Sequence, residues 1–388
     1  MKIIIFTHPD FSTSQSMPRF AKMIFDAMYE RGHYPEFWTA TPLASRIPVP
    51  SKFRKWLGYI DQFVIFPLQI RWRLRRLPEN TLFVFSDQAL GPWVPSVANR
   101  PHVIHVHDFM ALRSSLGEYA QNPTNWTGRH YQSLIRRGFG KGKNFLSVSE
   151  NTQQDLQRFL SKKPVFSEVV YNGMNYPYRP MNRAESKVEL ALANLTIPDV
   201  GFLLHVGGNQ WYKNREGVLE IYKAYAKQTP FPLPLWMIGA PPTQQLKKIA
   251  DGIGGNAQVR FIIGLSNEQL CAVYSSARLL IFPSLAEGFG WPIAEAMACG
   301  CLVLTTGQAP MTEVGGNAAF YIPAKPSNEK EDWATLGALH VSKILELENS
   351  DTQTQKELGY VQVAQFEAKR TLDTYECVYQ QVLARGTE

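Results

Sequence analysis

The 388-residue sequence is poor in the features that mark disulfide-bonded, membrane-spanning and metal-binding proteins. It has four cysteines, and the close pair Cys299 and Cys301 has no second Cys or His pair that would complete a zinc site. No window reaches the roughly 18 apolar residues of a membrane span. The first apolar run is four residues long, which is too short for a signal peptide. We therefore expect a protein of a reducing, cytoplasmic compartment.

Charge is distributed unevenly along the chain. Residues 1–180 hold 23 Lys and Arg against 12 Asp and Glu, whereas residues 181–388 hold 17 against 21, within a net charge of +7. The first half is therefore the one expected to meet an anionic partner. Nucleic acid would explain this basic half but not the paired glutamates of the second half, so we expect no nucleic-acid partner. No Gly-x-Gly-x-x-Gly motif follows the first apolar run, which disfavours a dinucleotide-dependent dehydrogenase.

The pattern of apolar runs predicts an α/β protein with two doubly wound parallel sheets. The chain is too long for one ordinary core. Short apolar runs alternate with helical patterns, as in parallel sheets. The expected strands are Lys2–Phe6, Thr81–Phe85, Val103–His107, Phe145–Ser149, Val169–Gly173, Phe202–Val206, Leu235–Gly239, Val259–Ile263, Leu279–Phe282 and Leu302–Thr306. The polar stretch 181–199 is the expected linker between residues 1–180 and residues 200–362.

The stretch Pro283–Leu304 (PSLAEGFGWPIAEAMACGCLVL) is the most informative part of the sequence. It predicts a loop, then a helix opened by Pro292, then a strand, so the helix N-terminus would face an anion. Glu287 lies on the loop and Glu295 about one turn into the helix. Both carboxylates can therefore face the same edge of the sheet and accept hydrogen bonds from sugar hydroxyls. An ordinary helix start, with Glu295 favoured by the helix dipole and Glu287 solvated, is the competing interpretation.

The segment EGFGWPIAEAMACG also resembles the E-x7-E signature of the family-4 retaining glycosyltransferases, which have the GT-B fold. The resemblance implies two Rossmann-like domains facing a crevice, with a C-terminal helix, about 364–388, that returns to the first domain. It implies that Glu287 and Lys213 are catalytic residues, and that Glu287 and the backbone of Gly288, Phe289 and Gly290 contact the donor sugar. Glu295 would bind the ribose of the nucleotide.

Two other segments extend the resemblance. The loop after Phe202–Val206 resembles the pyrophosphate-binding loop of the family, which implies donor-binding roles for Gly208, Asn209 and Lys213. Relatives often have an arginine near Asn209, and whether Asn209 or Arg215 replaces it stays open. In the first domain, VIHVHDFMALR resembles the family's "HD" segment. That match places His107 near the donor sugar as a catalytic residue, with Asp108 as an optional second member.

The two histidines of that segment have other interpretations. His105 and His107 alternate along the expected strand and share a face, which would suit a metal pair, or one core and one exposed histidine. We expect His105 to be structural. Ser12, Thr13, Ser14 and Ser16 stand where relatives carry glycines, so no phosphate contact is assigned to that loop.

The segment Arg46–Arg76 holds eight Lys and Arg and one acid, Asp61. Aromatic residues, among them Trp56 and Trp72, lie between its basic ends, a composition that suits a membrane interface. A core helix with a solvated basic flank is the alternative. We expect Arg73, Arg75, Arg76 and Arg129 to contribute to an acceptor or membrane surface, to which Trp126, Arg136 and Arg137 would add.

Taken together, these features predict a retaining glycosyltransferase of cell-surface polysaccharide or glycolipid biosynthesis. Its donor would be a nucleotide sugar such as GDP-mannose or a UDP-hexose, and its acceptor a glycan or lipid-linked glycan. None of the 11 aspartates has another at the +2 position, so no Asp-x-Asp metal motif is present. We expect neither metal nor cofactor, and a cytoplasmic protein with a peripheral position at the inner membrane face. A non-catalytic or epimerase- or hydrolase-type GT-B protein that binds nucleotide sugars is the alternative.

Overall fold

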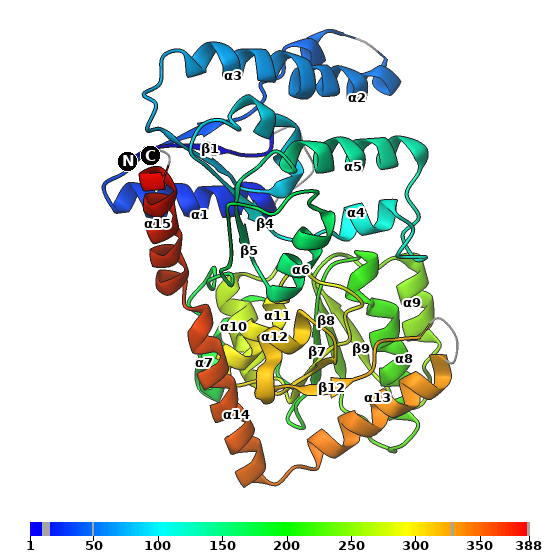
Figure 1. The fold of residues 1–388 in the computed structure, drawn as a ribbon. Helices are drawn as coiled ribbons and strands as arrows, with labels where there is room; N and C mark the ends of the chain where they lie inside the picture. Colours follow the sequence, from blue (N-terminus) through cyan, green and yellow to red (C-terminus); the bar gives the residue numbers. More distant parts are fainter. Residues whose placement is uncertain (10–15, 49, 327–329, 386–388) are drawn as a thin grey trace. The chain divides into compact units, whose positions relative to one another are not determined.

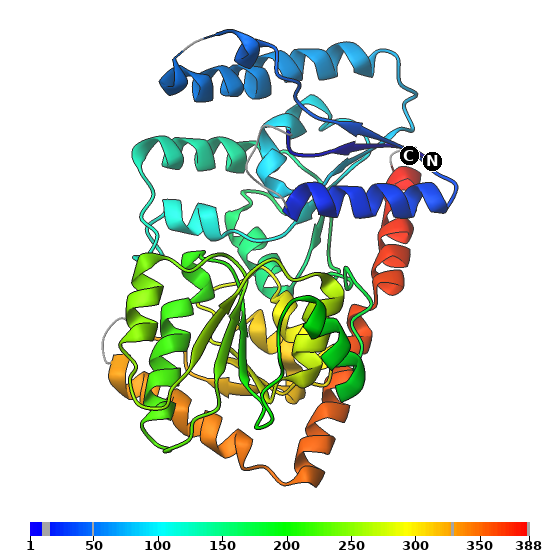
Figure 2. The same ribbon diagram turned by 180° about the vertical axis from the view of Figure 1, so that it is seen from behind.

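The computed structural model describes residues 1–9, 16–48, 50–326 and 330–385. It consists of two compact units, drawn from opposite sides in Figures 1 and 2. Unit 1 comprises residues Met1–Tyr171 and Lys369–Glu388, and unit 2 comprises Asn172–Ala368. Among the described residues, no helix is both long and apolar enough to cross a membrane.

Unit 1 is built on a six-stranded parallel sheet in the order β2-β1-β3-β4-β5-β6. Its strands are β1 (Lys2–Phe6), β2 (Tyr34–Trp38), β3 (Leu82–Phe85), β4 (His102–Val106), β5 (Asn144–Ser147) and β6 (Phe166–Val169). The residues of β1, β3 and β4 are almost all fully buried, because helices cover both faces of a parallel sheet.

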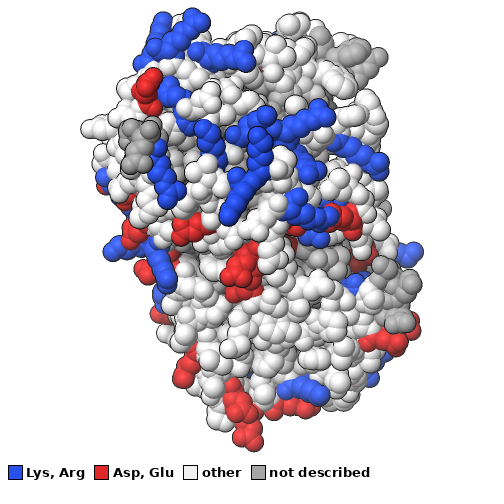
Figure 3. Space-filling view, viewed as in Figure 1, with Lys and Arg blue, Asp and Glu red and all other residues white. Residues whose placement is uncertain are grey.

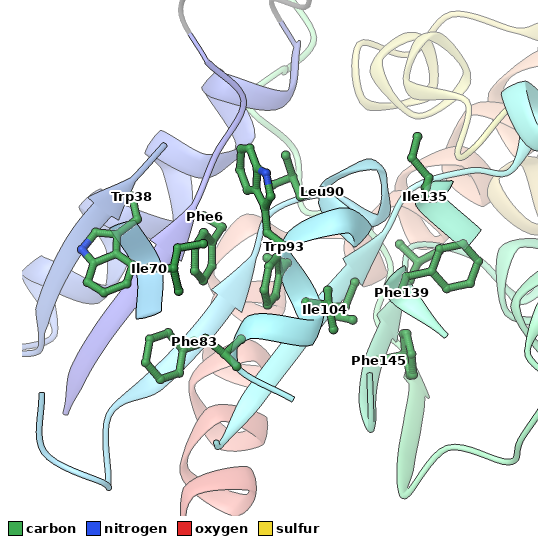
Figure 4. Close-up of a cluster of buried hydrophobic side chains, with 14 of the residues drawn as sticks. Phe6, Trp38, Ile70, Phe83, Leu90, Trp93, Ile104, Ile135, Phe139 and Phe145 are labelled. Atoms are coloured by element: carbon green, nitrogen blue, oxygen red, sulfur yellow. The ribbon is translucent and has the colours of Figure 1, made fainter. Parts of the chain in front are cut away.

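The helices of unit 1 cover the two faces of this sheet. They are α1 (Ser16–Glu30), α2 (Ser51–Ile60), α3 (Phe66–Leu74), α4 (Met110–Ser115), α5 (Trp126–Phe139), α6 (Glu150–Phe159) and α15 (Ala368–Arg385), with a π-helical turn at Asp61–Ile65 and 3-10 turns at Ala44–Arg46 and Gln88–Ser96. On one face, Phe6, Phe83 and Ile104 meet Ile70 and Trp93 in an aromatic-rich core (Figure 4). On the other face, Ile3, Ile5 and Val84 pack against α1 and α15.

Unit 2 repeats this plan with a parallel sheet in the order β12-β11-β10-β7-β8-β9. Its strands are β7 (Leu203–Val206), β8 (Leu235–Ile238), β9 (Val259–Ile262), β10 (Leu279–Phe282), β11 (Val303–Thr306) and β12 (Phe320–Ile322). Its helices are α7 (Arg183–Leu192), α8 (Arg215–Ala226), α9 (Gln244–Asp251), α10 (Asn267–Ser276), α11 (Trp291–Ala298), α12 (Met311–Gly315), α13 (Lys330–Leu345) and α14 (Asn349–Val363), with 3-10 turns at Trp211–Lys213, Gly316–Ala318 and Ala364–Phe366.

The two-sheet fold expected from the sequence is confirmed, including the final helix that packs in unit 1. An amphipathic pattern runs through residues 361–383 of the sequence, but the structure divides this stretch between α14 and α15. The break lies at Phe366, whose side chain is fully buried in unit 2 and whose carbonyl accepts a hydrogen bond from the Met174 N–H. These contacts fix the chain at Phe366, and the next residue, Glu367, is extended.

One strand prediction is wrong in its position. The sequence predicts a strand at Val169–Gly173, whereas β6 is Phe166–Val169. β6 is an edge strand that pairs with β5 alone, and its residues are half-buried or exposed. An edge strand therefore need not be an apolar run, and the apolar pair Val169–Val170 misled the prediction.

Candidate functional site

The strand–loop–helix segment of unit 2 forms as expected around Glu287 and Glu295. β10 is fully buried, and the loop 283–290 leads from it into α11. Gly290 closes the loop with φ +110°, a conformation that favours glycine. The helix begins at Trp291, which places Pro292 in its second position and not in the first. Proline is tolerated at either position, because a backbone N–H in the first turn would have no partner within the helix.

Lys213 and Glu287 form a close ion pair although 74 residues separate them. Lys213 Nζ donates to both carboxylate oxygens, at 2.8 Å to Oε1 and 3.0 Å to Oε2. Ser284 Oγ donates to the same Oε1 at 2.6 Å. Both side chains of the pair are largely buried. Removal of either one would leave the other as an uncompensated buried charge, which is energetically costly. Lys213 comes from the loop after β7 and Glu287 from the loop after β10, and these strands are neighbours in the sheet.

Glu295 is buried on α11, where Tyr274 of α10 donates a hydrogen bond to its Oε2 at 2.8 Å. Burial raises the pKa of Glu295 to about 7, against the smaller lowering effects of the Tyr274 hydroxyl and the Lys213 charge. Its Oε1 accepts no hydrogen bond within the described residues and can accept one from a ligand hydroxyl. The sequence analysis assigned no site role to Tyr274, which lies 21 residues upstream of Glu295.

Asn209 and Arg215 are hydrogen-bonded to each other. Arg215 Nη1 donates to Asn209 Oδ1 and, at 3.0 Å, to the Ala240 carbonyl. Asn209 Nδ2 donates to the Pro241 carbonyl at 2.7 Å. Arg215 is buried, and burial lowers its pKa. Its Nε and Nη2 have no partner within the described residues, so the guanidinium retains unused hydrogen-bond donors beside this loop.

The glycines and the aromatic residue predicted for the donor have distinct environments. A Cβ on Gly208 would lie 2.4 Å from the end of the Gln210 side chain, which would have to move. Phe289 is buried, with its ring against Trp291 and Phe366 at 5.2 Å each. The Phe289 ring is thus part of the packing of unit 2, and Gly288 and Phe289 would reach a ligand through their backbone.

His107 lies in unit 1, directly after β4. Its Nε2–H donates to the Ser86 carbonyl at 2.9 Å, and its ring packs edge-on against Phe20 at 4.5 Å. Burial lowers the pKa of His107, so the ring is neutral at pH 7. Asp108 lies just before α4, and its Oδ1 accepts the Met110 N–H at 2.9 Å. His105 is fully buried and bonded to Tyr379, in agreement with the structural role expected for it.

A His–Asp pair next to His107 escaped the sequence analysis. His8 follows β1, Asp87 follows β3, and His8 Nε2–H donates to Asp87 Oδ2 at 2.8 Å. Burial raises the pKa of Asp87, but the hydrogen bond and charge of His8 outweigh it, so the net shift is downward. β1, β3 and β4 are adjacent parallel strands, so residues just beyond their carboxyl ends come together. That rule was a usable signal for His8 and Asp87.

The predicted acceptor and membrane residues lie in unit 1 on two helical segments. Arg75 and Arg76 are exposed just after α3, and Arg129 is exposed on α5. Arg73 is half-buried, with its guanidinium 5.3 Å from the Trp38 ring centre, so it faces inward and contributes less to the surface than expected. The side chains of Ser12, Thr13, Ser14, Ser16, Lys52, Arg54 and Lys55 lie outside the described part of the chain.

Comparison with known sequences finds a family match within unit 2. Residues 193–351 match the family model of the glycosyl transferases group 1. The chain is 25% identical over 243 residues to O-antigen chain mannosyltransferase B of Escherichia coli, covering 58% of this chain and 63% of that protein. It is 24% identical over 185 residues to the serotype-specific mannosyltransferase WbdA of Escherichia coli, covering 46% of this chain and 22% of that one. The chain thus spans less than two thirds of the length of these curated relatives.

Comparison with solved structures covers nearly the whole chain. Sucrose-phosphate synthase from Thermosynechococcus elongatus superimposes with a TM-score of 0.73 at 16% identity, covering 99% of this chain and 100% of that one. WaaG, a glycosyltransferase involved in lipopolysaccharide biosynthesis, gives 0.70 at 16% identity, covering 98% and 99%. Similarity at such low sequence identity establishes the fold and not the activity. The chain therefore has the two-domain GT-B fold, and residues 193–351 of its second unit are similar to the group 1 glycosyltransferases.

Proposed function

We propose that this protein is a retaining glycosyltransferase that transfers a hexose, with mannose the first candidate, from a nucleotide-activated donor. The acceptor is a glycan or lipid-linked glycan of cell-surface polysaccharide or glycolipid biosynthesis. The observation that carries the proposal is the buried Lys213–Glu287 pair, with Glu295 close enough to feel the charge of Lys213. Mannose is suggested by the names of the relatives, an O-antigen chain mannosyltransferase among them.

Each residue then has a chemical role. Lys213, aided by the N-terminus of α11, stabilises the charge that develops on the departing diphosphate. Glu287 holds Lys213 in place and accepts hydrogen bonds from the sugar. Glu295 accepts a hydrogen bond from the ribose, and the Arg215–Asn209 pair shapes the loop that faces the diphosphate.

The reaction proceeds on one face of the sugar. The bond from the anomeric carbon to the phosphate oxygen breaks as the bond to the acceptor oxygen forms on the same side. The acceptor proton passes to the departing phosphate oxygen. His107 orients the sugar and does not attack it. The scheme uses no metal ion.

The acceptor and the cellular location follow from the same proposal. A lipid-linked acceptor would hold the enzyme at the cytoplasmic face of a membrane, where the basic surface of unit 1 meets anionic lipid.

The experiment is a panel of nucleotide sugars offered to the purified protein. GDP-mannose, UDP-glucose and UDP-N-acetylglucosamine are each tested for thermal stabilisation, slow donor hydrolysis and acceptor-dependent transfer. We expect one donor to stabilise the protein and to be turned over faster when acceptor is added. Lys213→Met should abolish turnover, whereas Lys247→Met, an exposed lysine on α9, should not. Donor binding without any transfer, or conversion of the donor to an epimer, would contradict the proposal.

A further inference from the structure

The helix α2–α3 of unit 1 exposes a stripe of large apolar side chains with no polar interruption. Residues 51–74 form one continuous helix through the π-helical turn Asp61–Ile65. Between residues 56 and 70, the described side chains that are exposed are Trp56 (57%), Ile60 (42%), Val64 (54%) and Leu68 (58%). Trp72 continues the series at 54%. A surface helix ordinarily shows polar residues to water, so this face is built for contact.

The π-helical turn helps to keep this stripe on one side. A step of four residues advances about 40° past a full turn of an α-helix, so residues at this spacing gradually wind around the axis. The wider π turn Asp61–Ile65 offsets part of that drift. The stripe therefore runs roughly 24 Å along the helix, from Trp56 to Trp72.

The opposite side of the helix is fixed to unit 1. Phe66 and Ile70 are fully buried, and Ile70 reaches into the core beside Phe6 and Phe83 (Figure 4). Tyr59 and Phe63 pack against Tyr131 of α5 at 5.9 and 5.8 Å. These aromatic residues thus support the helix, and Trp56 and Trp72 are the two that reach the surface.

The single acid of the segment does not face the stripe. Asp61 is buried, and its carboxylate accepts the N–H groups of Leu43, Ala44 and Ser45 and the Ser45 hydroxyl. Burial raises the pKa of Asp61, but these hydrogen bonds outweigh it and lower the net value. A carboxylate that would repel an anionic surface is therefore turned inward and held in its charged form.

Cations flank the stripe at its C-terminal end. Arg71, Arg75 and Arg76 are exposed and have no ion-pair partner within the described residues, and Arg76 lies over the Trp72 ring at 4.0 Å. Arg129 and Arg137 of α5 are exposed on the helix that contacts α2–α3 through Tyr131. Figure 3 shows Lys and Arg gathered over α3 and α5.

From this arrangement we infer that α2–α3 is a membrane-docking helix whose occupant is the surface of an anionic lipid bilayer. The helix lies flat, the apolar stripe enters the boundary between headgroups and acyl chains, and the arginines bind lipid phosphates. Charge complementarity selects this occupant, because the exposed face combines apolar and cationic groups and turns its one carboxylate away. The inference rests on the membrane position given under the proposed function and deepens it by naming the docking helix, whereas its test does not depend on the donor site of unit 2.

The test is flotation of the full-length protein with vesicles of phosphatidylcholine alone or mixed with phosphatidylglycerol, at low and high salt. We expect binding only to the mixed vesicles, weakened by salt. Val64→Gln/Leu68→Gln should reduce binding by at least tenfold, since two apolar side chains leave the bilayer. Arg71→Gln/Arg75→Gln/Arg76→Gln should also reduce it, by about fivefold per arginine.

Matched controls lie on unit 2. Phe231→Gln removes an exposed apolar side chain of unit 2. Lys187→Gln/Lys247→Gln/Lys248→Gln removes three exposed cations of the same unit. Neither control should change binding to vesicles. Donor turnover without vesicles should be unchanged in Val64→Gln/Leu68→Gln and in both unit 2 controls, so loss of transferase activity is distinguished from loss of membrane docking. Absence of binding at low salt, or equal binding by the Val64→Gln/Leu68→Gln variant, would overturn the inference. So would sedimentation showing that the stripe joins two copies of the chain.

Discussion

The raised pKa of Glu295 makes the stability of unit 2 depend on pH in a predictable direction. In the folded protein the pKa is about 7, against an ordinary value of 4.5. The folded state therefore keeps a proton that the unfolded chain releases, and stability falls as the pH rises between these values. The stabilising contribution of neutral Glu295 is complete below pH 4.5 and lost by about pH 7. At 1.36 kcal/mol per pH unit, the loss amounts to roughly 3 kcal/mol.

The perturbation that isolates this effect is Glu295→Gln, which preserves the shape and can still accept the Tyr274 hydrogen bond. Urea unfolding of the wild type and the variant, followed by circular dichroism from pH 5 to pH 8, gives the difference in unfolding free energy. We expect the unfolding free energy of the variant, relative to that of the wild type, to increase by roughly 3 kcal/mol as the pH rises across this range. Glu357→Gln, at an exposed site on α14, should differ from the wild type by the same amount at every pH. A difference between Glu295→Gln and wild type that does not vary with pH would refute the reasoning.

Further predictions concern the donor site. Glu287→Ala should destabilise unit 2 by about 3 kcal/mol, because Lys213 is left buried without its partner. Lys213→Met/Glu287→Leu should restore the unfolding midpoint without restoring turnover. Equal midpoints for the wild type and Glu287→Ala would be inconsistent with a stabilising ion pair. Arg215→Lys should weaken donor binding in a thermal-shift titration, because the bond to Asn209 is lost, whereas unchanged donor affinity would exclude a role for the Arg215–Asn209 pair. Proton NMR of the first product should show the anomeric configuration of the donor, and an inverted product would end the retaining assignment. A chelator should leave the rate unchanged, and a rate restored only by a divalent ion would show that metal is required.

The central strands of both sheets were predictable from the sequence, and most of the edge strands were not. β1, β3 and β10 are buried on both faces, so they appear as unbroken apolar runs. The edge strands β2 and β12 were missed and β6 was misplaced, because their residues are partly exposed. Edge strands are thus recognised through their partners, which sequence periodicity does not reveal.

The candidate site shows a similar division. The spacing of Glu287 and Glu295 was sufficient to place one on a loop and the other on a helix. The contact of Glu287 with Lys213, 74 residues away in the sequence, depends instead on the adjacency of β7 and β10 in the sheet. The proton held by Glu295 depends on burial beneath α10, and no local motif encodes that burial.

The pairing of Lys213 with Glu287 bears on how a donor would be selected. A lysine alone would attract any phosphate, including free nucleotide, whereas here a carboxylate already neutralises it through two hydrogen bonds. On the proposed function, a diphosphate has to share Lys213 with Glu287, and it meets repulsion from that carboxylate. A donor that carries a sugar offsets this repulsion, because its hydroxyls donate hydrogen bonds to Glu287, which free nucleotide cannot do. The same carboxylate that weakens the binding of phosphate thus favours the intact donor over its nucleotide product, and this preference would assist product release after transfer.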